Sequence, residues 1–381
     1  MLQIESNGEK SDVLSFVAAP KPDSNIPISI MHLGDQGVFG TSVMVTKTMM
    51  DRADVKDFHA VVHCGDICYA DKYLGSRPPP SGRSEQSVWD TWGQMMEPLA
   101  SQVPYMVSPG NHEMVGYESG WENGTIYNKR FIMPENERYY SFGVGMVYMI
   151  SVNTDDDIDG ASTQGVWLEH TLRDIDREEF PWVVVFQHRP IYNSNTNHGN
   201  WTGKSTYVYD AHPEAHLPEF SGWEDHYEDL IVKYGVDFVL SGHVHHYERT
   251  WPVRRVLKDG KRVTEVSKSY DNVKYPVHIT CGHAGIGLYT KTWSDYADED
   301  GVRPPIYQDD WDFSAAKSHA KWGHCEMEFL DRVTAKHYMF PMGHSEPAEE
   351  VTITKDKGET FSCQIIIRYN MKYSESKIVV H

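Results

Sequence analysis

The sequence predicts an α/β fold with substantial antiparallel content. Five short runs of mostly β-branched or aromatic residues are apolar nearly throughout, which is typical of strands buried on both faces. These runs are Ile28–Leu33, Ala60–His63, Tyr105–Val107, Trp182–Phe186 and Val236–Leu240. Stretches with the three-to-four-residue apolar spacing of amphipathic helices lie between them. We therefore expect a sheet whose faces are covered by helices.

The N-terminal segment is too short to be a domain of its own. Residues 1–19 predict one or two strands, with apolar and polar residues alternating over 12–17, and the Ala-Pro-Lys-Pro stretch that follows resembles a linker. This segment is either the tail of something missing or an edge strand added to the main fold.

The remaining elements follow from periodicity. Apolar side chains recur at helical spacing in residues 166–175 and 227–234. Residues 139–152 carry two glycines between apolar arms and predict a hairpin. A second hairpin is expected near the C-terminus, where 351–354 and 361–367 flank a Lys-Asp-Lys-Gly turn.

Composition excludes several classes of protein. The chain has 381 residues, and 55 Asp and Glu against 35 Lys and Arg give a formal charge of −20. Nucleic acids and anionic membranes both need a clustered basic surface, so neither is an expected partner. No run of 18 apolar residues predicts a transmembrane helix. Glu5, Glu9 and Lys10 stand where a signal peptide is apolar, so no export signal is predicted in this chain.

The five cysteines are too few for a disulfide framework. No C-x-x-C spacing occurs, which excludes a zinc ribbon or a thioredoxin-like motif. Cys64 and Cys68 flank Asp66, and we interpret both as small packing residues.

Metal-binding residue types follow all five apolar runs. The segments are Gly34–Gly37, Cys64–Tyr69, Gly110–Glu113, Gln187–His188 and Gly242–His245. Ligands bind beyond the carboxyl ends of strands in open α/β sheets, so we expect these Asp, Tyr, Asn and His side chains to converge. Glycine recurs just before the candidate ligands, where it allows close backbone approach. The two histidines of Gly-His-x-His face the same side and suit two metals roughly 3.5–4 Å apart.

The order of these motifs resembles the calcineurin-like metallophosphoesterases, and specifically the purple acid phosphatases. The pattern G-D-x-G, G-D-x-x-Y, G-N-H-E/D, V-x-x-H and G-H-x-H is complete, and the resemblance covers roughly residues 25–345. Gly37 stands where the wider superfamily usually has a histidine, and Tyr69 follows Asp66 by three residues. A tyrosinate is a hard, anionic donor that suits ferric iron.

The resemblance implies a fold and a domain organisation. The fold would be an αββα sandwich of two mixed β-sheets flanked by helices. Residues 1–22 would be the remnant strand or strands of a missing N-terminal β-sandwich plus a linker. Residues 23–345 would form the catalytic domain, and 346–381 a C-terminal β-hairpin extension and tail. A truncated chain would explain both the missing domain and the missing signal peptide.

The resemblance also implies a set of metal ligands. A ferric ion, Fe(III), would be held by Asp35, Tyr69 and His245, and Asp66 would bridge it to a divalent Fe, Zn or Mn. The divalent metal would be held in addition by Asn111, His188 and His243. Oxygen and imidazole donors without thiolate suit these borderline-hard ions.

Two further histidines match catalytic positions of the family. His112 and His198 correspond to positions used for substrate binding and proton donation, although many plant members have a histidine pair where this chain has Asn197 before His198. His63, His246 and His283 are interpreted as structural, and Asp155–Asp157 as a solvated loop.

The implied activity is hydrolysis of phosphate monoesters, in which hydroxide generated on the two metals attacks phosphorus in line. One alternative is a phosphodiesterase or nucleotide pyrophosphatase that uses the same site, and another is a non-catalytic metal- or phosphate-binding homologue. The expected partner is a small phosphate ester, and a homodimer is compatible with the resemblance. Family members are mostly secreted, vacuolar or lysosomal, and glycosylation motifs at Asn123 and Asn200 favour such a location.

Overall fold

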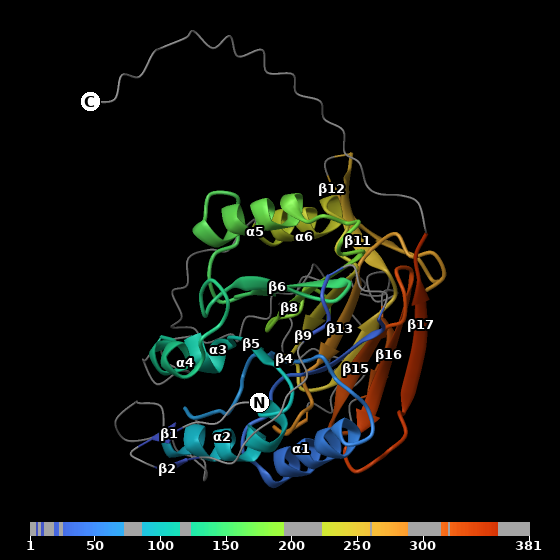
Figure 1. Ribbon diagram of the computed structural model, residues 1–381. Helices are drawn as coiled ribbons and strands as arrows, with labels where there is room; N and C mark the ends of the chain where they lie inside the picture. The colour runs from blue at the N-terminus through green and yellow to red at the C-terminus, as the bar shows by residue number, and fades with distance from the viewer. Residues whose placement is uncertain are drawn as a thin grey trace, which may run out of the picture.

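Two mixed sheets stacked face to face, with helices on their outer faces, form the protein (Figure 1). The computed structural model describes residues 5–6, 9–10, 19–22, 26–71, 86–114, 123–193, 223–259, 261–288, 314–318 and 321–356. This arrangement is the αββα sandwich that the sequence resemblance implied, and the predicted fold class is confirmed.

The first sheet has six strands. In spatial order they are β17 (Glu349–Thr354), β16 (Thr334–Pro341), β15 (Gly323–Phe329), β3 (Ile28–Leu33), β4 (Ala60–Cys64) and β5 (Tyr105–Ser108). Strands β3, β4 and β5 are parallel, and the other pairings are antiparallel. Helices α1 (Gly40–Ala53) and α2 (Gln86–Ala100) pack on this sheet through a shared apolar cluster.

The second sheet has seven strands. In spatial order they are β14 (Ser314–Ser318), β10 (Tyr247–Thr250), β13 (Val277–Cys281), β9 (Phe238–Ser241), β8 (Trp182–Gln187), β7 (Val147–Val152) and β6 (Tyr140–Val144). Strands β7, β8, β9 and β13 run parallel. Helices α5 (Thr163–Asp174) and α6 (Trp223–Lys233) cover this sheet, and Figure 1 shows them on the side opposite α1 and α2.

Short elements complete the described chain. They are β1 (Glu5–Ser6) paired with β2 (Glu9–Lys10), β11 (Val253–Lys258) paired with β12 (Lys261–Val266), and the short helices α3 (Asn111–Met114) and α4 (Thr125–Arg130). Within the ranges given above, no helix is long and apolar enough to cross a membrane.

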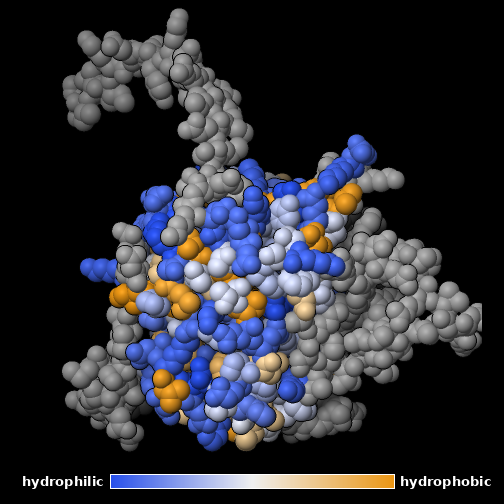
Figure 2. Space-filling model, turned by 90° about the vertical axis from the view of Figure 1, so that its right-hand side faces the viewer, coloured by the Kyte–Doolittle hydropathy of each residue, from blue (hydrophilic) through white to orange (hydrophobic). Residues whose placement is uncertain are grey.

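Three apolar layers hold the sandwich together. β3 shows how one strand serves two of them, since Ile28 and Ile30 point between the sheets while Met31 and Leu33 face α1 and α2. All six residues of β3 are buried, which is the physical reason for its lack of polar alternation. The surface is different: Figure 2 shows a mainly hydrophilic face with apolar residues in small, separate groups.

The predicted elements correspond closely to the observed ones. The five apolar runs are β3, β4, β5, β8 and β9, although β9 begins two residues later than expected. The two predicted helices are α5 and α6, and the hairpin is β6 and β7. Residues 351–354 lie in β17, which pairs with β16. The second predicted arm, 361–367, and the alternating segment 12–17 lie outside the described residues.

Candidate metal centre

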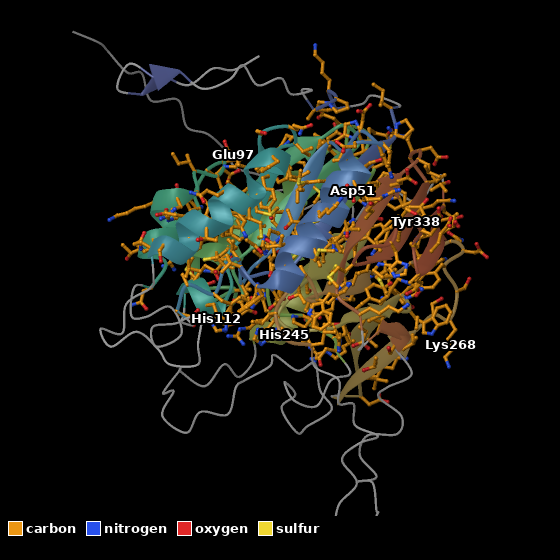
Figure 3. All side chains as sticks on the ribbon, turned by 90° about the horizontal axis from the view of Figure 1, so that it is seen from below. Asp51, Glu97, His112, His245, Lys268 and Tyr338 are labelled. Atoms are coloured by element: carbon orange, nitrogen blue, oxygen red, sulfur yellow. The ribbon has the colours of Figure 1, made fainter. Side chains whose placement is uncertain are left out.

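The candidate ligands lie at the carboxyl ends of β3, β4, β5, β8 and β9, in the segments that follow each strand. Figure 3 shows His112 and His245 side by side at one edge of the fold, although they come from segments far apart in the sequence. Ring contacts of Tyr69 with both histidines agree with this view, with centroids 4.4 Å from His112 and 6.3 Å from His245.

One donor group consists of Asp35, Tyr69 and His245. The hydroxyl of Tyr69 donates to Oδ1 of Asp35 at 3.0 Å and lies 3.1 Å from Nε2 of His245. Nε2 of His245 lies 3.4 Å from the same Asp35 oxygen. A phenol, a carboxylate and an imidazole therefore present one donor atom each to a common point. This is the set that the resemblance assigned to the ferric ion.

The second donor group contains Asp66, Asn111, His188 and His243. Nε2 of His188 is central, at 2.9 Å from Oδ1 of Asn111, 3.2 Å from Oδ1 of Asp66 and 3.0 Å from Nδ1 of His243. One donor atom from each of Asp66, His188 and His243 lies within 4.8 Å of the other two. The two groups are adjacent because the backbone N–H of His243 donates to Oδ2 of Asp35 at 2.6 Å.

All seven predicted ligands thus lie in one buried cluster, divided into the two groups that the resemblance implied. Their roles as ligands stay a prediction. The donor types fit two borderline-hard cations, because carboxylate, phenol, amide and imidazole are present and thiolate is not among them.

The backbone that presents these ligands is strained. Asp35, Asp66, Tyr69 and His243 all have positive φ, between 51° and 67°. Non-glycine residues rarely adopt this conformation, and such outliers persist where the surrounding structure enforces them. Four of seven candidate ligands share it, which indicates that the loops are bent to aim these side chains.

Close approach of the loops requires glycine at two positions. A Cβ on Gly65, whose φ is +74°, would lie 2.5 Å from Nδ1 of His188. A Cβ on Gly110 would lie 2.3 Å from Oδ1 of Asp66. Both contacts are shorter than real Cβ atoms make, so the expected role of these glycines agrees with the structure.

The cluster concentrates buried negative charge. Burial lowers the pKa of His188, but the carboxylates of Asp66, Asp35 and Asp155 outweigh it and raise that pKa to about 10. Burial raises the pKa of Asp66, but His188 and His112 hold it well below its usual range. A site that stabilises cations this strongly is electrostatically suited to metal ions.

Glu113 holds together two loops that carry candidate ligands, and the sequence reasoning missed this role. Its carboxylate accepts hydrogen bonds from the backbone N–H groups of Asp66, Ile67 and Gly110 at 2.9–3.0 Å. It therefore ties the loop after β4 to the loop after β5. Burial and the Asp66 carboxylate raise the pKa of Glu113 to about 8, against the effect of these backbone donors. Its place in the Gly-Asn-His-Glu motif was the available signal.

His112 lies beside both donor groups. Its backbone N–H donates to Oδ1 of Asp66 at 3.0 Å, and Nε2 lies 3.7 Å from Oδ2 of the same residue. Nδ1 lies 2.6 Å from Oδ2 of Asp71, a partner that the sequence reasoning also missed. The other predicted catalytic residue, His198, lies outside the described residues.

The interpretation of Asp155–Asp157 as a solvated loop was wrong for Asp155. Its side chain is only 6% exposed and forms an ion pair with Arg189 at 2.9 Å. Arg189 in turn lies 3.1 Å from Nε2 of His243. The Asp155–Arg189 pair therefore packs against a candidate ligand.

Two of the three histidines interpreted as structural contact residues other than the seven candidate ligands. Nδ1 of His63 lies 2.9 Å from the Tyr105 hydroxyl, and Nε2 of His246 lies 3.3 Å from a carboxylate oxygen of Glu248. His283 is completely buried.

Comparisons with known proteins agree with this geometry. The family model described as calcineurin-like phosphoesterase matches residues 28–247. A probable purple acid phosphatase 20 from Arabidopsis thaliana is 35% identical over 71% of this chain and 55% of its own length. A probable inactive purple acid phosphatase 1 from the same plant is 33% identical over 75% of this chain and 46% of its own length.

A solved structure shows the same fold. The purple acid phosphatase PPD1 from yellow lupin, Lupinus luteus, superimposes with a TM-score of 0.70 at 24% identity, covering 91% of this chain and 57% of its own. The chain spans about half the length of the curated relatives given above. It belongs to the calcineurin-like phosphoesterase family, and the relatives that it matches are purple acid phosphatases, as the motifs predicted.

Proposed function

We propose that this protein hydrolyses phosphate monoesters at a centre of two metal ions, as an acid phosphatase. The observation that supports the proposal most directly is the division of seven buried donors into two adjacent groups. Asp35, Tyr69 and His245 would hold a ferric ion, and Asn111, His188 and His243 a divalent Fe, Zn or Mn. Asp66 would serve both.

Two bound metals supply charge neutralisation for the phosphoryl group and activate water for in-line attack. The chain's own residues orient the substrate and move a proton. Asp71 lies against Nδ1 of His112, which leaves Nε2 directed toward Asp66. In this proposal the Nε2–H of His112 donates to the departing alkoxide, which makes the alcohol a better leaving group.

Two alternative functions would be distinguished from the proposed one by the same experiment. A phosphodiesterase or nucleotide pyrophosphatase would use the same donors with a different ester. A non-catalytic homologue is the second, and one relative of this chain carries the name "probable inactive". The complete donor set speaks against a homologue that has lost its ligands.

The test combines metal analysis with a substrate panel. We expect about two metal ions per chain at this centre, iron among them, with visible absorbance and monoester turnover in acid that exceeds diester turnover. Asp66→Asn should lose both metals and the activity, because in this proposal its carboxylate would bridge them. The matched control is Asp51→Asn, an exposed carboxylate on α1 that Figure 3 shows away from His112 and His245.

Faster diester turnover would move the assignment to a phosphodiesterase. Iron-free protein without visible absorbance would contradict the purple acid phosphatase proposal. Bound metal without turnover of any ester would favour the non-catalytic homologue.

The remaining proposals concern partners and location. The substrate would be a small phosphate ester, with neither nucleic acid nor membrane as a partner, and the protein would act as a monomer or homodimer. We place it in a secreted, vacuolar or lysosomal compartment by analogy with its plant relatives. Glycosidase treatment of protein from its natural source should lower its apparent mass if Asn123 or Asn200 is glycosylated.

A further inference from the structure

A second group of metal-binding residue types lies between the two sheets. His32 on β3, Cys281 on β13 and Cys325 on β15 each offer one donor atom, and these atoms lie within 4.8 Å of one another. All three side chains have no exposed surface. None of them belongs to the donor groups described above, which contain no sulfur.

Strand pairing brings the three residues together. His32 and Cys325 are directly opposite in the antiparallel pair of β3 and β15, where side chains of opposed residues lie on the same face. Cys281 comes from the other sheet and faces the same inter-sheet core. A metal ion held by all three would therefore join the two halves of the sandwich.

His337 contacts the histidine of this group. Its Nε2 lies 3.2 Å from Nε2 of His32, while Nδ1 of His32 is buried without a hydrogen-bond partner. A buried polar nitrogen that lacks a partner costs about 1–3 kcal/mol. If Nδ1 of His32 binds a metal, its Nε2–H donates to Nε2 of His337, which is how ligating histidines are commonly oriented.

A further imidazole lies close to this group. His283 follows Cys281 by two residues, is completely buried, and has no hydrogen-bond partner at either ring nitrogen in the described part of the chain. The ring of Tyr247 lies between it and the group, with centroids 6.0 Å from His283 and 5.9 Å from His337. His283 lies outside the three donors that come within 4.8 Å of one another, so it is a neighbour of the group and not one of its ligands.

We propose that His32, Cys281 and Cys325 form a structural zinc site that joins the two sheets. Cysteine and histidine are the usual ligands of structural zinc. Two thiolates balance the charge of Zn²⁺ and the imidazole is neutral, so the complex has no net charge to bury. Binding releases the two thiol protons to solvent, and the ion enters during folding because the site is closed.

X-ray absorption at the zinc edge tests the proposal on the purified full chain, folded in the presence of zinc. The expected result is a sulfur shell at about 2.3 Å, with about one sulfur-bound zinc per chain. Cys281→Ala and Cys325→Ala should each abolish this shell. The matched control is Cys64→Ala, since Cys64 is equally buried in the same core but lies outside the donor group.

Several results would overturn the proposal. Zinc with only nitrogen and oxygen neighbours would do so, and so would the absence of zinc beyond the catalytic centre. A disulfide between Cys281 and Cys325 would also overturn the proposal, because it would leave no thiolates to bind zinc. Thiol titration of the unfolded, unreduced protein would detect this disulfide as two missing thiols. The catalytic centre has no sulfur donor, so a missing sulfur shell leaves the proposed phosphatase activity untouched.

Discussion

Tyr69 is the residue that distinguishes this centre from a generic two-metal site. Its side chain is almost completely buried, and its hydroxyl lies within 3.1 Å of both Asp35 and His245. A phenolate bound to ferric iron produces a charge-transfer absorption. If the proposed ferric ion is bound, this one hydroxyl would therefore give the protein a visible absorption.

Tyr69→Phe should bleach this absorption while leaving the fold intact, because the ring keeps its contact with His112. The visible spectrum and the iron content per chain measure the effect. Tyr105→Phe is the matched control, since Tyr105 is a partly buried tyrosine whose hydroxyl contacts His63 outside the two donor groups. An unchanged spectrum in Tyr69→Phe would contradict the assignment of this residue as a ferric ligand.

In the proposed mechanism, Asp71 would act on catalysis through His112. Its carboxylate lies 2.6 Å from Nδ1 of the histidine, so it fixes both the ring and the position of the proton. Asp71→Asn should lower kcat roughly 10–100-fold with a smaller change in KM, and should move the alkaline limb of the pH profile. Asp90→Asn, which removes an exposed partner of Arg130, is the control. A loss confined to KM would argue that Asp71 positions substrate instead.

At the scale of elements, the loops that follow the parallel strands provide the candidate ligands of the site. Within each sheet these loops meet because parallel strands end at the same edge. The loops after β3, β4 and β5 meet those after β8 and β9 because the two sheets are stacked, and glycine permits them to come within van der Waals distance of one another. Glu113 then ties two of the loops together through three backbone hydrogen bonds.

Gly65→Ala should therefore disrupt the centre. The added methyl group would collide with His188 and with the backbone of Gly110, at a residue that already has positive φ. We expect loss of bound metal and a lower melting temperature. Gly93→Ala provides the control, because its Cβ would meet nothing within 4 Å in the middle of α2. That variant should be neutral or more stable by up to about 1 kcal/mol. Full metal content in Gly65→Ala would contradict the close packing of these loops.

Helix α2 is an element that sequence reasoning overlooked although a signal was present. Its buried residues Trp89, Trp92, Met96 and Leu99 recur at intervals of three and four. Helix α1 gave a weaker signal, because its buried face includes Thr46, whose hydroxyl accepts a hydrogen bond from Gln36. A polar residue on a buried face obscures the apolar period.

At the scale of the whole molecule, an ion pair joins the outer helix α1 to the six-stranded sheet. Arg52 donates to both carboxylate oxygens of Glu326, at 2.8 and 3.0 Å, and His324 lies 3.2 Å from the same group. Burial raises the pKa of Glu326, but the hydrogen bonds from His324 and Arg52 prevail and lower it to about 2. The carboxylate therefore stays ionised in the acidic range in which the proposed enzyme works.

Glu326→Gln should lower the free energy of unfolding by roughly 2–3 kcal/mol at neutral pH, because a buried charge-assisted contact is lost. Since the folded-state pKa lies below the ordinary value of 4.5, the stabilisation is complete above that pH and disappears as pH falls toward 2. Denaturant unfolding of both proteins across this range measures the difference. Glu350→Gln, at an exposed pair with Lys336, should change stability by less than about 1 kcal/mol. If the two proteins differed as much in free energy of unfolding at pH 2 as at neutral pH, the ionised carboxylate of Glu326 would not be the cause of the difference.

The sequence patterns alone determined the strands and the residue types that follow them, because both are local properties. The two-sheet architecture and the roles of the candidate ligands were implied by the family resemblance of the motifs. Strands buried on both faces have no polar alternation, and each strand is followed directly by the residues that its loop presents. Only the tertiary structure decided which further residues contact the candidate ligands and their loops. Asp71 faces His112, and Glu113 spans two loops, through contacts between separate segments. Cys281 and Cys325 also meet only in the tertiary structure, because their spacing in the chain matches no metal-binding motif. Two strands from different sheets bring them together, and no sequence interval encodes that distance.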